Sequence, residues 1–229
     1  MSSPLMPKTR IIPIGFSYPY DIKRFYHNQE IKTIFDIGAN IGQTSLFLNK
    51  HFNNAKIFAF EPASQTFKTL CENSQHAERI KPFNLAVGSQ EDELLISIRE
   101  NSELNTLVRE SSKNTALEKT VETVKVTTVD TFCQQQNIEK IDLLKMDVQG
   151  FELEVLKGAE SYLTNNLVSF IYSEVSFEKA NKECQEFGEL HDFLRKNNFR
   201  FSGFYELFRW GDQKRYFGFC NALFVNCNL

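Results

Sequence analysis

The chain has 229 residues, of which 41% are hydrophobic, and 26 basic residues oppose 29 acidic ones for a formal net charge of −3. This length suits one α/β domain without a second independent core, and the near-neutral charge favours neither nucleic acid nor an anionic membrane surface as a partner. The five cysteines are widely spaced and include no Cys-x-x-Cys pair, so we expect no disulfide framework or zinc site and a cytoplasmic location.

The N-terminal segment, residues 1–30, is predicted to be an arm or lid. Residues 1–20 lack a helical or strand period and are interrupted by Pro4, Pro7, Pro13 and Pro19. Residues 21–29 are predicted to form a short helix over the domain edge. Because no basic region precedes a long apolar stretch, we expect neither a signal peptide nor a membrane-spanning helix.

From residue 31 onward, strand and helix patterns alternate. The predicted strands are 33–37, 56–60, 80–87, 141–146 and 168–173, and the predicted helices are 42–52, 65–75, 130–136, 150–163 and 187–197. Ser64 is the predicted N-cap of helix 65–75. Residues 199–205 and 218–226 are expected to close the sheet as an antiparallel pair. This alternation predicts an α/β fold with a mostly parallel seven-stranded sheet and helices on both faces.

Residues 89–129 differ from this pattern. The ranges 94–99 and 123–128 have strand character, and a polar stretch separates them. We interpret this region as a hairpin-like insertion with a mobile tip, within a single domain that spans residues 31–229.

The first strand ends in a glycine turn that leads into a helix. Gly38 and Gly42 are spaced Gly-x-x-x-Gly, and not Gly-x-Gly-x-x-Gly as in dinucleotide sites. Such a turn can present backbone N–H groups to a nucleotide-like ligand, and its spacing favours S-adenosylmethionine, which has no pyrophosphate. Asp36 can face the cationic amino group of a methionine moiety or fix the turn, and Asn40 can bind the ligand carboxylate or stabilise the turn.

The next two strands also end in candidate cofactor residues. Glu61 lies 19 residues beyond Gly42 and can accept hydrogen bonds from both ribose hydroxyls, a role that we favour over a solvated acid before a turn. The residues from Asn84 to Gly88 follow, and small side chains such as Ala86 can pack an adenine face or simply belong to the core.

A second signal lies at the end of strand 141–146. Asp147 ends this apolar strand and can orient a hydroxyl nucleophile or take its proton, which we rank above holding a divalent cation together with Glu152. No metal is predicted, although a divalent cation stays possible. Glu152 also suits the first turn of a helix for electrostatic reasons alone. Glu174 ends the next strand and either touches substrate or pairs with a basic residue. The candidate catalytic residues are thus Asp147, Glu152 and Glu174.

Taken together, these segments resemble the FkbM family of S-adenosylmethionine-dependent methyltransferases. The resemblance rests on Phe35-Asp-Ile-Gly-Ala-Asn-Ile-Gly42, Ala59-Phe-Glu-Pro62, Asn84-Leu-Ala-Val-Gly88, Val126-Thr-Thr-Val-Asp130 and Leu144–Glu160. It implies a Rossmann-like class I methyltransferase fold and O-methylation of a hydroxyl on a sugar, glycolipid, peptide or other secondary metabolite.

Carried over by position, the resemblance also implies which residues form the site. The implied cofactor residues are Asp36, Gly38, Asn40, Gly42, Glu61, Asn84, Ala86 and Asp147, with Asp147, Gln149 and Glu152 near the methyl group and acceptor. The closing strand departs from the family pattern, because Asn221 stands where an Asp often precedes Ala-Leu-Phe.

Two other functions remain open at this stage. A nicotinamide-dependent oxidoreductase is one, and a non-catalytic S-adenosylmethionine-binding module is the other. The expected partner is a small-molecule hydroxyl acceptor, and a homodimer is possible. Aromatic side chains near the C-terminus can stack on a sugar or flat ring, or pack the closing hairpin; they are Phe204, Tyr205, Phe208, Trp210 and Tyr216.

Overall fold

The computed structural model describes residues 12–27, 29–98, 106–107, 120–181 and 184–229. Its main sheet consists of β1 Thr33–Ile37, β2 Lys56–Phe60, β3 Ile80–Phe83, β8 Ile141–Met146, β9 Val168–Ser176, β10 Phe199–Tyr205 and β13 Phe219–Asn226. The strand order is β10-β13-β9-β8-β1-β2-β3, and only β13 runs antiparallel to its neighbours β9 and β10. The predicted mostly parallel seven-stranded sheet with an antiparallel C-terminal strand is therefore confirmed.

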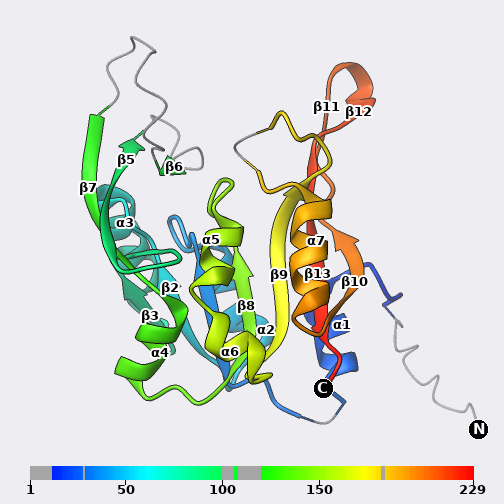
Figure 1. Cartoon of the computed structure of the whole chain (residues 1–229), viewed down its shortest axis with the longest axis horizontal. Coiled ribbons are helices and arrows are strands. Elements are labelled where there is room, and N and C mark those ends of the chain that lie inside the picture. Colours follow the sequence, from blue (N-terminus) through cyan, green and yellow to red (C-terminus); the bar gives the residue numbers. More distant parts are fainter. Residues whose placement is uncertain (1–11, 28, 99–105, 108–119, 182–183) are drawn as a thin grey trace, which may run out of the picture.

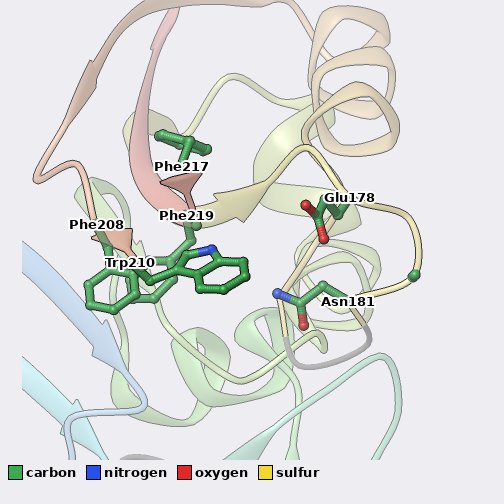
Figure 2. A pocket seen from close by; sticks show the side chains of 8 residues that line it. Glu178, Asn181, Phe208, Trp210, Phe217 and Phe219 are labelled. Atoms are coloured by element: carbon green, nitrogen blue, oxygen red, sulfur yellow. The ribbon is translucent and has the colours of Figure 1, made fainter. Parts of the chain in front are cut away.

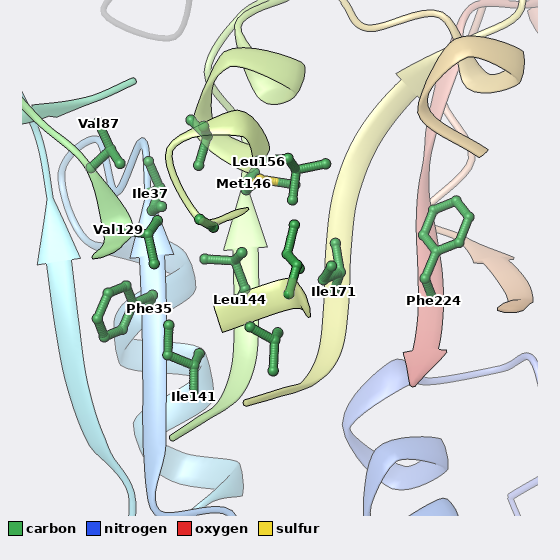
Figure 3. Close-up of a cluster of buried hydrophobic side chains, with 14 of the residues drawn as sticks. Phe35, Ile37, Val87, Val129, Ile141, Leu144, Met146, Leu156, Ile171 and Phe224 are labelled. Carbon is green, nitrogen blue, oxygen red and sulfur yellow. The ribbon is translucent and has the colours of Figure 1, made fainter. Parts of the chain in front are cut away.

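Helices cover both faces of this sheet (Figure 1). They are α1 Tyr18–Phe25, α2 Gln43–His51, α3 Ser64–Ser74, α4 Val129–Gln136, α5 Glu152–Lys157, α6 Glu160–Thr164 and α7 Phe187–Lys196. Consecutive strand residues point to opposite faces. Leu143 thus belongs to the apolar cluster under α1–α3, whereas Leu144 belongs to the cluster under α4–α7 that Figure 3 shows. Burial on both faces explains the continuous apolar runs of the parallel strands.

A second sheet is formed by β4 Ala86–Val87, β5 Asp92–Ile98, β6 Thr106–Leu107 and β7 Thr120–Thr127, in the order β4-β7-β5-β6. β5 and β7 pair antiparallel, as the predicted hairpin requires. The tip at residues 99–105 and 108–119 lies outside the described residues.

The single strand predicted for residues 80–87 is wrong. It breaks at Asn84, whose side-chain amide donates hydrogen bonds to the carbonyl oxygens of Glu61 and Pro62, at 3.0 and 2.8 Å. Beyond the break, Ala86 pairs with Val126 in the second sheet.

The single helix predicted for residues 150–163 is also wrong. α5 and α6 are separate because the chain passes very close to the second sheet at Gly158, where an added Cβ would lie 2.0 Å from the carbonyl oxygen of Gly88. The first helix, in turn, begins at Tyr18 and ends at Phe25, earlier than the predicted 21–29, because Pro19 fits the first helical turn. Residues 1–11 of the predicted arm lie outside the described residues.

Ser64 is not the N-cap of α3. The helix begins at Ser64 itself, with Ala63 in the cap position and no capping bond from its own side chain. The backbone N–H and the hydroxyl of Ser64 both donate to the carboxylate of Glu122 on β7. The second sheet therefore supplies the cap that we had expected from the helix's own sequence.

The parallel strands all end at one edge of the main sheet, which we call the carboxyl edge; the opposite edge, where they begin, is the amino edge. A small hairpin of β11 Arg209–Trp210 and β12 Tyr216–Phe217 rises at the carboxyl edge, as does the β5–β7 pair (Figure 1). No helix among the described residues is long and apolar enough to span a bilayer.

Candidate functional site

The glycine turn after β1 is held between the ends of β2 and β8. The backbone N–H groups of Gly38 and Ala39 donate to the carbonyl oxygen of Phe60 at 3.0 and 2.9 Å. Gly38 has a φ of 75°, and a Cβ there would lie 1.9 Å from the backbone oxygen of Asp147. Only glycine fits such an approach at a positive φ, so the turn is packed directly against the start of the Leu144–Glu160 block.

Glu61 joins this turn to the end of β2. Its carboxylate accepts the backbone N–H of Asn40 at 3.1 Å and that of Ala63 at 2.9 Å, and the residue is buried. Burial raises the pKa of Glu61 to about 7, although the two N–H groups and Lys145 lower it in part. A carboxylate has about four lone-pair positions, so these two bonds leave capacity for further donors such as hydroxyls.

Beneath the turn, Asp36 forms a fully buried ion pair. Its Oδ1 lies 2.9 Å from Nζ of Lys145, and its Oδ2 accepts a 2.6 Å hydrogen bond from the Ser45 hydroxyl. The sheet register places Asp36 directly beside Lys145 on the neighbouring strand. The contacts of Asp36 in the described residues are thus to side chains and not to the N–H groups of the turn, and it reaches the turn through Lys145, so its two predicted roles stay predictions.

Lys145 is a site residue that the sequence analysis missed. Its ammonium group also donates to the carbonyl oxygen of Gly38 at 3.2 Å and lies 3.8 Å from the Asp147 carboxylate. Burial alone would lower the pKa of Lys145, but Asp36 and Asp147 outweigh it and raise that pKa, so the amine stays charged. The signal was present: a lysine within a predicted central strand, where both faces are buried, needs a buried partner.

Asp147 and Glu152 lie at the end of β8 and the start of α5. The Asp147 side chain is 39% exposed and accepts a hydrogen bond from the Gln149 amide at 3.3 Å. Glu152, by contrast, is fully buried; its Oε1 accepts the Val148 N–H at 3.0 Å, and its Oε2 has no hydrogen-bond partner within the described residues. Burial raises the pKa of Glu152 to about 7.

Glu174 brings a third acid to the same place from β9. Burial raises its pKa to about 8, and the negative charges of Asp147 and Glu152 add to that rise. A hydrogen bond with the Cys184 thiol and the charge of Lys145 oppose it. Cys184 showed no motif in the sequence, and the structure assigns it this contact with Glu174. The candidate catalytic acids therefore interact electrostatically, and within the described residues the Lys145 cation lies near them.

The predicted site residues gather at the carboxyl edge, as the topology of the strands requires. Asn84 reaches the Glu61 carbonyl with its side chain, whereas Ala86 is buried in the second sheet. Gly42 begins α2 with a φ of 94°. Within the described residues, no three histidine, cysteine or acidic side chains are placed to hold a metal ion.

The model of the methyltransferase FkbM domain matches residues 36–201 of this chain. Methyltransferase sdnD of Sordaria araneosa is 32% identical over 62% of this chain and 64% of its own length. Hexuronic acid methyltransferase AglP of Haloferax volcanii is 28% identical over 64% of this chain and 57% of its own length. 2-O-methyltransferase NoeI of Sinorhizobium fredii is 27% identical over 62% of this chain and 63% of its own length. The chain thus spans about three-fifths of the length of these curated relatives.

Solved structures share the fold at low sequence identity. The METTL16 methyltransferase domain superposes with a TM-score of 0.53 at 11% identity, covering 92% of this chain and 66% of that one. M. capricolum TrmK in complex with S-adenosyl-homocysteine superposes with a TM-score of 0.50 at 10% identity, covering 91% of this chain and 67% of that one. The fold is that of the class I methyltransferases, as the sequence analysis predicted.

Proposed function

Because the chain belongs to the methyltransferase FkbM domain family, we propose that it transfers a methyl group from S-adenosylmethionine to a hydroxyl oxygen of a small molecule. The observation that carries this proposal is the arrangement of the carboxyl edge. There the turn at residues 38–42 and the Glu61 carboxylate lie next to Asp147, across the buried Lys145. The half with the turn and Glu61 suits a nucleoside, and the half with Asp147 suits an acceptor hydroxyl that gives up its proton.

The residues of the first half fit S-adenosylmethionine. Glu61 has free lone pairs for two ribose hydroxyls, while its bonds to Asn40 and Ala63 hold it in place. Gly38 and Gly42 have left-handed backbone conformations, and a Cβ at either position would collide with Asp147 or Leu70, so the two glycines allow the tight shape of this turn. The side-chain amide of Asn84 donates a hydrogen bond to the backbone carbonyl oxygen of Glu61 and so helps to hold Glu61 in place. When bound, the cofactor would supply an electrophilic methyl group at this edge.

The second half provides for the acceptor. An alcohol is a weak nucleophile at neutral pH, so a positioned carboxylate that orients its O–H and accepts the proton speeds the reaction. Asp147 is the best-placed acid because its side chain is partly exposed, whereas Glu152 is fully buried. The Lys145 ammonium group lies 3.8 Å from the Asp147 carboxylate, and Glu174, whose pKa is raised to about 8, interacts electrostatically with the same carboxylate. Orientation of the reacting atoms supplies the rest of the rate enhancement.

The names of two relatives support transfer to oxygen. NoeI is a 2-O-methyltransferase, and AglP acts on a hexuronic acid. The rival oxidoreductase would need the Gly-x-Gly-x-x-Gly turn that Gly38 to Gly42 do not provide. Isothermal titration with S-adenosylmethionine and with NAD separates the two, and we expect heat of binding only with the former. Binding of NAD alone would contradict the proposal.

Methyl transfer itself is tested with Asp147→Asn. We expect kcat to fall about 100- to 10,000-fold, while the dissociation constant for S-adenosylmethionine changes less than about threefold, because the amide cannot accept the proton. A methyl-transfer assay over a panel of hydroxylated metabolites measures the first, and calorimetry measures the second. Asp192→Asn is the matched control, since that acid on α7 is 71% exposed and away from the site. Near-normal turnover of Asp147→Asn would remove Asp147 from the mechanism.

A further inference from the structure

A pocket of about 340 Å³ opens between the segment that follows β9 and the β11–β12 hairpin. Its aromatic wall comes from the hairpin and the start of β13, and its polar wall comes from the segment after β9. The lining includes Phe208, Trp210, Phe217, Phe219, Glu178 and Asn181 (Figure 2). This volume is at the small end of the range for ligand pockets, which suits a single ring.

The pocket adjoins the candidate acids. In the β9–β13 register, Phe219 lies opposite Ser176, and Asn221 lies opposite Glu174. Two residues along a strand span about 7 Å, so the aromatic wall begins roughly one ring's width beyond Glu174. A molecule in the pocket can therefore extend a hydroxyl toward the acids of the carboxyl edge.

The aromatic wall is rigid and yet exposed. Phe208 stacks on Phe219 at 4.6 Å, and backbone hydrogen bonds link Phe208 to both Phe219 and Gly218. A Cβ on Gly218 would lie 2.8 Å from the Phe208 ring and 3.4 Å from Trp210, so the glycine lets both rings lie against the backbone. Nevertheless, Trp210 remains 54% and Phe208 47% exposed. Large aromatic rings held in place without being buried are typical of binding surfaces.

The opposite wall carries hydrogen-bonding groups. Figure 2 shows Glu178 and Asn181 across the pocket from the Trp210 indole. Their loop is fixed, because the Glu178 N–H donates to the Ser176 hydroxyl at 3.2 Å and the Asn181 N–H donates to the Glu178 carbonyl at 3.0 Å. A carboxylate accepts hydrogen bonds from hydroxyls, and an amide can both donate and accept.

The charge of the lining restricts the ligand further. No lysine or arginine among the described residues lines the pocket. The nearby Arg209 guanidinium is bound to the carbonyl oxygens of Lys214 and Arg215 within the hairpin. A carboxylate or phosphate on the ligand would therefore meet the charge of Glu178 without a compensating cation in the described lining.

We propose that this pocket binds a neutral pyranose ring of a glycoside acceptor, with the C–H face of the sugar on Trp210 and Phe208 and its hydroxyls on Glu178 and Asn181. The role of this sugar as acceptor rests on the proposed methyl transfer, whereas its binding does not. The predicted preference is for neutral sugars over uronic acids at this subsite.

Trp210 is the only tryptophan of the chain, so its fluorescence reports on the pocket without any methyl donor. The probes are methyl glycosides of glucose, galactose and mannose, each paired with the matching uronic acid glycoside. We expect a saturable fluorescence change for at least one neutral glycoside, with binding about tenfold weaker for its uronate. The proposal is overturned if no neutral glycoside gives a saturable change up to about 50 mM, if the uronates bind as well or better, or if only a flat aromatic such as catechol binds.

Two variants test the walls separately. In Glu178→Gln, the preference for the neutral sugar should shrink to less than about threefold, because the repelling charge is gone. In Trp210→Ala, calorimetry should show binding at least about tenfold weaker. Phe16→Ala is the matched control, since Phe16 is 77% exposed and lies outside the pocket lining. An unchanged preference in Glu178→Gln, or unchanged affinity in Trp210→Ala, would contradict the proposal.

The same variants separate this inference from the proposed function. If sugars bind as expected but no methyl transfer to them occurs, the pocket stands as a sugar site and its acceptor role fails. If a neutral glycoside is methylated but Trp210→Ala leaves its KM unchanged, the pocket fails and the methyltransferase proposal stands.

Discussion

The two edges of the main sheet hold buried acids in opposite ways. At the amino edge, Asp142 accepts the Tyr26 hydroxyl at 2.6 Å and the backbone N–H groups of Lys32 and Thr33 at 2.7 and 2.9 Å. At the carboxyl edge, Glu152 is equally sheltered but keeps an oxygen without a partner among the described residues. Both oxygens of Asp142 have hydrogen-bond partners, whereas one oxygen of Glu152 has none among the described residues.

This difference separates structure from function within one sheet. A buried carboxylate with hydrogen-bond partners on both oxygens stabilises the chain around it. At the carboxyl edge, burial raises the pKa values of Glu61, Glu152 and Glu174, and acids with such raised pKa values cluster at functional sites. The predictions below test whether the amino edge serves stability only and whether the carboxyl edge gives up stability for its site.

The largest effect on stability is expected from Lys145→Met. Without the amine, the buried Asp36 carboxylate would keep the Ser45 hydroxyl as its one side-chain partner among the described residues, so we expect the free energy of unfolding to fall by about 3–5 kcal/mol. Urea unfolding measures this loss. The double variant with Asp36→Asn should recover at least about half of it, because no charge is then left unpaired. No recovery would show that the ion pair is not the reason for the loss.

Asp142→Ala should lower the free energy of unfolding by about 3 kcal/mol. The substitution removes the acceptor of the Lys32 and Thr33 N–H groups and of the Tyr26 hydroxyl. Because these bonds lie at the amino edge, kcat of the protein that remains folded should stay within about twofold of the original. Asp142→Asn, which keeps one carbonyl acceptor, serves as the milder control. A large fall in kcat with intact folding would mean that the amino edge also supports the site.

The sequence predicted the strands better than the contacts between them. Residues 33–37, 56–60 and 141–146 were assigned correctly because strands buried on both faces are continuous apolar runs bounded by turns. That the acids at the strand ends lie at the same edge of the sheet could also be predicted, because parallel strands all end at one edge. The pairing of Lys145 with Asp36 could not, because it depends on the register between two strands that are far apart in the chain.

The errors have the same origin in long-range contacts. Strand 80–87 broke because Asn84 bonds the chain near Glu61, and helix 150–163 broke because Gly158 meets the second sheet. Neither contact leaves a local pattern in the sequence. Helix propensity and period describe neighbours along the chain, so they continue an element until a distant segment interrupts it.

The carboxyl edge should also show a pH dependence to which Glu152 contributes, and Glu152→Gln removes that contribution. Since folding raises the pKa of Glu152 from 4.5 to about 7, the folded protein holds this proton more tightly than the unfolded chain does. The contribution of Glu152 to stability is therefore most favourable below about pH 4.5 and is lost as the pH rises through about 7. At pH 8 the neutral glutamine should be more stable than the glutamate by about 2 kcal/mol, with little difference at pH 4.5.

Urea unfolding at several pH values between 4.5 and 8 checks this sign. Glu72→Gln on the exposed side of α3 is the control and should change stability by less than about 0.5 kcal/mol. Parallel curves for Glu152→Gln and the original protein would mean that Glu152 titrates alike in the folded and unfolded chain. In that case its burial would carry no stability cost, and the contrast between the two edges would lose its main support.

The smallest effect concerns the cap that the second sheet provides for α3. Glu122→Ala removes the acceptor of the Ser64 N–H and hydroxyl, so we expect a loss of about 1 kcal/mol, as for other N-caps. Glu122→Gln, which keeps a carbonyl oxygen, should lose less. α3 begins directly after the Glu61–Ala63 contact, so calorimetry with S-adenosylmethionine decides how the cap bears on the site. Unchanged affinity would make Glu122 a structural acid like Asp142, whereas a fall of about tenfold would place the second sheet among the supports of the carboxyl edge.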